Sequence, residues 1–454
     1  MNISLMMIKS NWTEFISRVA AAGAQRLEEL CQRIDGVKLC ARASQVRGAD
    51  MPCTIDLSPE TLSALMGGQN CHAEITFEDG VVWLARFRVV SAVTPPPEVC
   101  DYTLQSEATT MQFLERHTRV PSPRVFDWAC ESDPKNTTGV GYILMEKLNG
   151  TSLHWPSATA SQKEKIVRQY AEIMLELERH PFDQLGALIS KDSAAAESQI
   201  KVGASTDFTT FRSGDGGMPL GPFRSSKEAY RAFVEASIQM IVSGEVGTAE
   251  SALDIILAYK FGLDVLDRVS EQTATDDNGG EQFFLKHADD KGDHILVNDD
   301  FDIVGIIDWE CCQTSPREQA FSSPCMMWPV SAFYDGSNEL TEEELLLARV
   351  FRERGREDLA SCVLHGRKVQ RLLFVLGPLV VDEDKSTLSG LFVGLKRAFD
   401  GHDCKTDGQG VEDEWEAWKA KALEDWKHEA LIETALEANG QLAAAHRVGA
   451  HIAV

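Results

Sequence analysis

Hydrophobic and polar residues alternate most clearly over residues 70–90, in the stretch NCHAEITFEDGVVWLARFRVV. Alternation with a period of two indicates half-buried strands, and the EDG between the two runs is typical of a hairpin turn at Asp79–Gly80. The next segment has a helical period instead, at Leu104, Ala108, Met111 and Leu114. A proline-rich connector and a short apolar strand, YILME, follow it. The pattern therefore predicts a strand-rich unit with one helix over residues 52–150.

Beyond residue 150 the pattern is mainly helical. Ile166, Tyr170, Met174 and Leu177 fall on one helix face, and Ser161 and Glu164 have the spacing of a capping box. Residues 190–225 are rich in Ser, Gly and Thr and are predicted to form a long loop. A stripe near the C-terminus is expected to pack inside the protein, at Trp415, Trp418, Ala422 and Trp426. We expect three parts: an N-terminal helical extension over 1–51, the strand-rich unit over 52–150 and a helical unit over 151–454.

One segment, HADDKGDHILVNDDFDIVGIIDWE at residues 287–310, interrupts the helical pattern. HILV and DIVGII are predicted strands joined by the turn-forming NDDF. Such a hairpin holds its two ends close together, so Asp289 and Asp308 are predicted to share one small site. Phosphoryl transfer needs one carboxylate to orient the attacking hydroxyl and another to hold magnesium on the phosphates.

The chain is strongly acidic, with 44 Lys and Arg against 70 Asp and Glu and a net charge of −26. This charge argues against nonspecific binding to nucleic acid or to an anionic membrane, and it allows a cationic small-molecule substrate. The start, MNISLMMIKSNW, lacks the apolar core of a secretory signal, and no run of eighteen apolar residues suggests a membrane helix. We expect a cytoplasmic protein with reduced cysteines, a monomer or a homodimer.

The H-x-D of HADDKGDHILV, followed by IIDWE, resembles the aminoglycoside phosphotransferase and choline kinase-like family. The resemblance implies an α+β, protein-kinase-like bilobal fold with a small antiparallel-sheet lobe containing one helix and a large, mainly helical lobe. It implies that Asp289 is catalytic, that His287 supports its loop and that Asp308 binds the metal. The implied cofactors are ATP and magnesium, or manganese in its place. DDKGDHILV and GPF also resemble segments of uncharacterised fungal members.

The resemblance extends upstream. MGGQNCHAEI is similar to a phosphate-binding glycine loop, Arg86 in WLARFR to the base that pairs with phosphates, and Glu107 to its helix partner. YILMEKLNG is similar to the segment that joins the two lobes beside adenine. The nucleotide-binding residues so implied are Gly67, Gly68, Asn70, Arg86, Glu107, Glu146, Lys147 and Leu148.

One position departs from the family pattern. The second metal ligand of the family is usually an asparagine five residues after the catalytic aspartate, and here that position is His294, preceded by Asp293. Imidazole suits softer divalent metals than magnesium. Three alternatives stay open: Asp293 takes over the role, His294 binds the metal, or Asp308 holds it alone.

The sequence thus favours an ATP-dependent phosphotransferase that acts on a hydroxyl of an unidentified small molecule. The alternative is a catalytically weak, pseudokinase-like protein that binds a nucleotide or another ligand. A third interpretation, a transition-metal hydrolase site of His287, Asp289, Asp293 and His294, leaves the upstream pattern unexplained.

Overall fold

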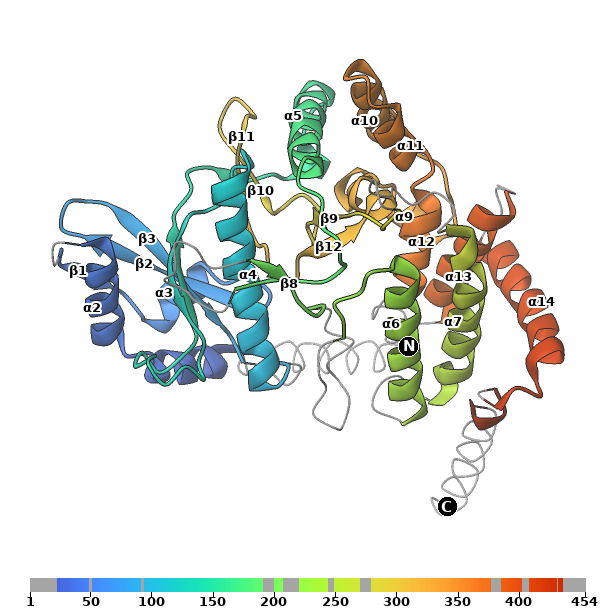
Figure 1. The fold of residues 1–454 in the computed structure, drawn as a ribbon, viewed down its shortest axis with the longest axis horizontal. Helices are drawn as coiled ribbons and strands as arrows, with labels where there is room; N and C mark the ends of the chain where they lie inside the picture. The colour runs from blue at the N-terminus through green and yellow to red at the C-terminus, as the bar shows by residue number, and fades with distance from the viewer. Residues whose placement is uncertain are drawn as a thin grey trace, which may run out of the picture. The chain divides into compact units, whose positions relative to one another are not determined.

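The computed structural model describes residues 23–48, 51–90, 94–190, 200–206, 220–243, 249–269, 279–376, 385–401, 408–430 and 432–435. They belong to two compact units (Figure 1). The first is built from Met1–His117, Ser122–Asn149 and Ile189–Ile200, and the second from Thr118–Pro121, Gly150–Leu188 and Lys201–Val454. Within the described part of the chain, no helix is both long and apolar enough to cross a membrane.

The first unit contains a five-stranded antiparallel sheet in the order β1-β2-β3-β5-β4. The strands are β1 Cys53–Ile55, β2 Asn70–Phe77, β3 Val82–Arg88, β4 Val125–Ala129 and β5 Tyr142–Glu146. The predicted hairpin is confirmed as β2 and β3, and Gly80 in its turn has a φ of 83°, which favours glycine.

The helices of the first unit pack on this sheet. They include α2 Gly36–Arg47, α3 Pro59–Ala64 and α4 Pro97–His117. The predicted helix at Leu104–Leu114 is confirmed within α4, whereas α3, capped by Ser58, was not predicted. Leu39 and Ala43 of α2 are fully buried in the same core as the sheet. Helix α2 is therefore part of the first unit and not of a separate extension.

The second unit is mainly helical, as predicted. Its helices are α5 Ala160–Glu178, α6 Ser226–Val242, α7 Ala249–Val269, α8 Arg317–Ala320, α9 Val330–Tyr334, α10 Glu342–Glu353, α11 Glu357–Leu364, α12 Arg367–Leu376, α13 Lys385–Asp400 and α14 Gly408–Trp426, with 3-10 turns at Trp155–Ser157 and Cys325–Met327. The tryptophan stripe of α14 packs as expected: Trp415 is fully buried and lies edge-on to Phe392. The capping box of α5 uses Thr159 and Gln162, so the prediction of Ser161 and Glu164 was wrong.

Short strands also lie between the helices along the chain. They are β6 Thr151–Ser152, β7 Leu188–Ile189, β8 Lys201–Val202, β9 Phe283–Lys286, β10 Ile295–Val297, β11 Ile303–Ile306 and β12 Gln313–Pro316. The predicted hairpin is confirmed as β10 and β11, and its turn is fixed because the Asn298 side chain accepts the N–H groups of Asp300 and Asp302. Strand β9 pairs with β12. Most of the predicted 190–225 loop and the start of the N-terminal helix lie outside the described residues.

The predicted fold class is confirmed: an α+β chain with a small antiparallel sheet in its N-terminal part and a mainly helical remainder.

Candidate functional site

The loop between β9 and β10 is anchored by His287. This side chain is buried, and its Nδ1 accepts the backbone N–H of Asp289 at 3.2 Å. Because Nδ1 accepts, Nε2 carries the proton and donates to the carbonyl of Ile307 at 2.9 Å. Burial lowers the pKa of His287, so the ring stays neutral near pH 7. His287 thus positions the backbone of Asp289 and does not act as a proton carrier.

Trp309 and His294 complete the support of this loop. The ring of Trp309 is buried, lies edge-on to His287 at 4.9 Å between centroids, and donates its N–H to Ile306. His294 stacks on His287 with centroids 4.2 Å apart. Its backbone carbonyl accepts the N–H of Ile307. The backbone of Ile307 therefore contacts both histidines, and these contacts also position the next residue, Asp308.

The loop turns at Gly292, which has a φ of 111°. A Cβ atom there would also lie 3.3 Å from Cβ of Met326. Both the backbone conformation and the close neighbour favour glycine. The Gly292 N–H points to Nδ1 of His294 at 3.4 Å, so the loop has one defined path from Asp289 to β10.

The two adjacent aspartates of the loop have different environments. Asp290 is largely buried; it pairs with Lys286 and accepts the N–H of Cys325 at 2.8 Å. Asp289 is 50% exposed, and the contact described for its carboxylate is Lys291 at 2.6 Å. These contacts hold the Asp290 carboxylate in place, whereas the Asp289 carboxylate faces solvent.

The residues that the sequence predicts to bind a metal differ in their exposure to solvent. Asp308 and Asp293 are exposed, and Asp308 has a φ of 61°, a left-handed conformation that aspartate tolerates. His294 is 3% exposed, and burial lowers its pKa to about 2. Its Nδ1 accepts a backbone N–H, so Nε2 carries the proton and offers no lone pair. Asp308 and Asp293 fit magnesium, which prefers oxygen ligands, and His294 does not in this arrangement.

Within the described residues, no three His, Cys, Asp or Glu side chains lie close enough together to hold a metal ion. The transition-metal hydrolase interpretation is therefore wrong, because its four proposed ligands do not form such a group. Both ring nitrogens of His287 are already engaged with the backbone. Magnesium stays compatible with the site, since it needs only one or two protein carboxylates beside phosphate oxygens.

A cavity of about 470 Å³ lies beside Asp289 within the second unit. Its lining combines charged, polar and aromatic groups. Its lining includes Lys286, Asp289, Asp290, Gln313, Ser315, Gln319, Ser323, Trp328, Gln370, Leu373 and Phe374. Asp308 is not among the lining residues. The volume is ordinary for a small-molecule site.

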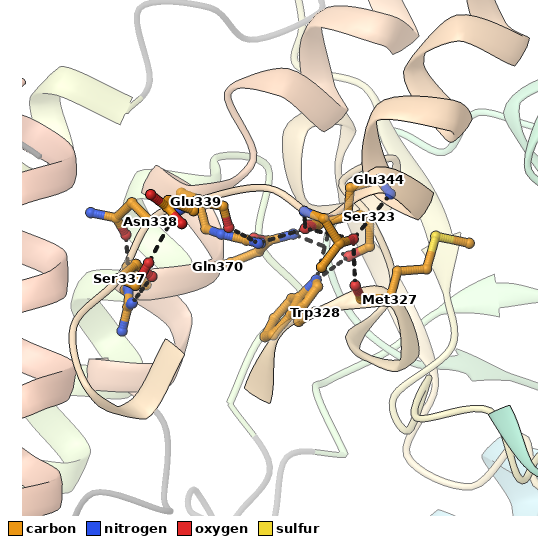
Figure 2. Close-up of polar contacts among 11 residues, drawn as sticks. Ser323, Met327, Trp328, Ser337, Asn338, Glu339, Glu344 and Gln370 are labelled. Carbon is orange, nitrogen blue, oxygen red and sulfur yellow. Dashed lines mark hydrogen bonds and ion pairs between the residues drawn. The ribbon is translucent and has the colours of Figure 1, made fainter. Parts of the chain in front are cut away.

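A buried polar network supports one wall of this cavity (Figure 2). Glu344 is fully buried; it accepts the hydroxyl of Ser323 at 2.6 Å and pairs with Arg367 at 2.7 Å. Gln370 donates to Ser323 at 3.0 Å and accepts from Arg367 at 2.6 Å. The Trp328 N–H donates to the carbonyl of Ser323 at 2.9 Å. This wall, made by Ser323, Trp328 and Gln370, is called the supported wall below.

The sequence did not reveal the supported wall. The network that holds it comes from three separate segments, and Glu344, Arg367 and Gln370 look like ordinary surface residues of amphipathic helices. One signal was present: Thr341 and Glu344 have the capping-box spacing, and the structure forms that box at the start of α10.

The first unit brings Arg86 and Glu107 together. Arg86 on β3 and Glu107 on α4 form an ion pair, with side chains 7% and 2% exposed. A buried pair of this kind holds an arginine in one orientation, as a phosphate-binding base requires. The predicted pairing of these two side chains is therefore present, and the binding of phosphates by Arg86 stays a prediction.

The other residues expected to bind nucleotide also lie in the first unit. Gly67 donates its N–H to the Asn70 carbonyl at 2.7 Å, so this amide is already used, whereas a Cβ on Gly68 would meet nothing within 4 Å. Glu146 ends β5, and its backbone N–H donates to Arg124 at 2.8 Å. Lys147 pairs with Glu74 at 2.6 Å, and Leu148 follows it. Another group can therefore approach Gly68 closely, whereas the N–H of Gly67 is already used within the chain.

Comparison with known proteins gives a short sequence match. No protein-family model matches the chain. It is 31% identical over 149 residues to a subtelomeric hrmA-associated cluster protein of Aspergillus fumigatus, and 30% identical to the corresponding protein of a second strain. Each match covers 32% of this chain and 28% of the relative. The matched region is thus well under a third of those curated relatives.

Several solved structures are similar in fold. A protein described as a fructosamine-3-kinase of Thermobifida fusca matches at 14% identity over 80% of this chain and 98% of that chain, with a TM-score of 0.46. One described as an aminoglycoside phosphotransferase of Ralstonia eutropha matches at 14% identity over 90% and 99%, with a TM-score of 0.44. An ethanolamine kinase of Plasmodium vivax matches at 10% identity over 78% and 80%, with a TM-score of 0.40.

At 10–14% identity, these likenesses concern the fold alone.

Proposed function

We propose that this chain is an ATP-dependent phosphotransferase that acts on a hydroxyl group of a small molecule. One observation carries the proposal: the exposed carboxylate of Asp289 lines a cavity of about 470 Å³, on a loop whose backbone His287 fixes. A carboxylate in this position accepts or orients the proton of an attacking hydroxyl. Asp289 is therefore the proposed catalytic residue, and His287 is a positioning residue.

The first unit supplies the proposed nucleotide site. The buried pair with Glu107 holds the Arg86 guanidinium in place for the phosphates, since a preorganised charge loses little entropy on binding. The open space at Gly68 admits a phosphate group, and the end of β5 near Glu146, Lys147 and Leu148 is proposed to meet adenine.

Asp308 and Asp293 are proposed to hold magnesium with ATP. Both carboxylates are exposed and offer the oxygen atoms that this ion prefers. When bound, the ion would neutralise charge on the phosphates. Asp293 lies 3.7 Å from Lys291, and this exposed pair is weak enough to open without a large cost.

A second candidate is a catalytically weak protein that binds a nucleotide or another ligand. His294 favours it, because the residue expected to be the second metal ligand is buried against His287 and presents no lone pair. Without a second ligand, binding of the metal and nucleotide can persist while transfer is slow.

Two measurements on the full chain distinguish these candidates. Thermal stability is measured with ATP and magnesium or manganese, and transfer of labelled γ-phosphate is measured on a panel of small alcohols, sugars and amines. The phosphotransferase requires both a stability shift and labelled product, and Asp289→Asn must keep the shift and lose the product. A shift without product favours the binding protein, and the lack of any shift rejects both.

A further inference from the structure

The cavity beside Asp289 has two chemically different sides. Trp328, Leu373 and Phe374 form an apolar side. Trp328 and Phe374 also pack on Phe333, with ring centroids 4.9 Å and 5.1 Å away, so this side is rigid. The polar side consists of Gln313, Gln319, Ser315 and Ser322, which carry amides and hydroxyls. A ligand that fills the cavity must therefore offer both an apolar and a polar surface.

The supported wall has little hydrogen-bonding capacity left. The Ser323 hydroxyl donates to Glu344 and accepts from both Trp328 and Gln370. The Trp328 N–H is used, and the Gln370 amide is engaged through both its oxygen and its nitrogen. This wall therefore contacts a ligand mainly by packing.

The polar side, in contrast, offers donors. The side-chain oxygen of Gln319 accepts the Tyr230 hydroxyl at 2.8 Å, and that of Gln313 accepts the Ser205 hydroxyl at 2.7 Å. Their amide N–H groups are what each side chain has left for a ligand. Ser315 is fully buried, and its hydroxyl has no hydrogen-bond partner among the described residues. Protein atoms cover this hydroxyl, so the donors left for a ligand on the polar side are the two amides.

Each carboxylate that lines the cavity already has a cationic partner within the chain. Asp289 and Asp290 pair with Lys291 and Lys286. A polyamine or a quaternary ammonium group would have to displace Lys291 from Asp289, and the described lining residues offer it no further carboxylate.

We propose that the cavity binds a neutral, polyhydroxylated ring compound with one apolar face, of the class of free sugars and glycosides. Such a ring packs its C–H face on Trp328 and Phe374, and its oxygens accept the amide N–H groups of Gln313 and Gln319. The inference rests on the proposed function only in assigning a hydroxyl of this ring as the acceptor beside Asp289. The acidic composition allows a cationic acceptor, whereas this inference predicts that the acceptor is a neutral molecule.

The test is ligand binding to the full chain without nucleotide, measured by saturation-transfer NMR and calorimetry. The probes are methyl glucoside, methyl galactoside and myo-inositol, with methyl glucosaminide, choline and kanamycin as aminated counterparts. At least one neutral probe is expected to bind tenfold more tightly than every aminated one. Gln313→Leu should weaken that binding about tenfold, because the ligand loses an amide N–H donor. Gln319→Leu should weaken it too, and Gln45→Leu on the exposed face of α2 should not. The melting temperature of each variant checks that the chain still folds.

The outcomes separate this inference from the proposed function. Tighter binding of aminated probes, binding of none, or unchanged binding in Gln313→Leu overturns the neutral-ring inference even if labelled phosphate is transferred to choline or kanamycin. Binding of a neutral probe that Gln313→Leu weakens, with no phosphate transfer from ATP, upholds the inference and rejects the phosphotransferase.

Discussion

The Asp289 loop and the supported wall line the same cavity but use their polar groups in opposite ways. Asp289, Lys291 and Asp293 of the loop are 50–61% exposed and meet in surface ion pairs. Behind the wall, Glu344 and Arg367 are at most 6% exposed, and Glu344 accepts from several neighbours. Surface pairs contribute little to stability, whereas a buried pair is costly to break. The polar groups of the loop are thus open to solvent, whereas those behind the wall hold its shape.

The largest expected effect separates two adjacent aspartates of the loop. Asp289→Ala should lower kcat by about 10²–10⁴-fold, as expected for loss of a general base, and change the free energy of unfolding by less than about 1 kcal/mol. Asp290→Ala should instead destabilise the fold by about 1.5–3 kcal/mol, because Lys286 and the Cys325 N–H lose their acceptor. Transfer of labelled phosphate and urea denaturation measure the two effects. If Asp289→Ala unfolds the chain, the division of roles is wrong.

The next effect concerns the supported wall. Glu344→Ala should lower the free energy of unfolding by about 3–5 kcal/mol, since it leaves the buried Arg367 unpaired. Glu343→Ala is the matched control: its partner Lys163 is partly exposed, so the cost should stay below about 1 kcal/mol. Denaturation in urea gives both values. Equal costs for the two neighbours would show that the network does not support the wall.

The smallest effect is a pH dependence. Burial lowers the pKa of His294 to about 2, whereas an unfolded histidine titrates near about 6.5. Between these values the unfolded state binds more protons, so stability is full above pH 6.5 and falls as the pH drops, by up to about 1.4 kcal/mol per pH unit for each such group. His294→Asn should therefore make the loss between pH 6.5 and 5 shallower. The control variant His428→Asn, at an exposed position, should leave this loss of stability unchanged. If both variants lose stability with falling pH as steeply as the wild type, the assignment of His294 as buried and neutral is contradicted.

Much of the local structure could be predicted because its signals are local. The hairpins β2–β3 and β10–β11 carry their turns in the sequence, at Gly80 and Asn298. The capping box of α5 shows the limit of such signals. Thr159 with Gln162 and Ser161 with Glu164 both satisfy the pattern, and the sequence alone does not say where the helix begins.

Long-range packing explains what the sequence did not predict. An amphipathic helix such as α2 looks the same whether it forms an extension or joins a core, and Leu39 and Ala43 place it in the core. His294 was expected at the metal because of its position in a motif, and its stacking on His287 could not be read from that position. The Asp289 loop could be predicted, and the wall that faces it could not.

Glu344 joins two tasks that are usually separate. The same carboxylate completes the first turn of α10 with Thr341 and fixes Ser323 and Arg367 behind the cavity. Any change that loosens the beginning of this helix would therefore also reshape the cavity. A change at Gln313 or Gln319 would instead remove one hydrogen bond, to Ser205 or to Tyr230, and leave the contacts of Glu344 in place.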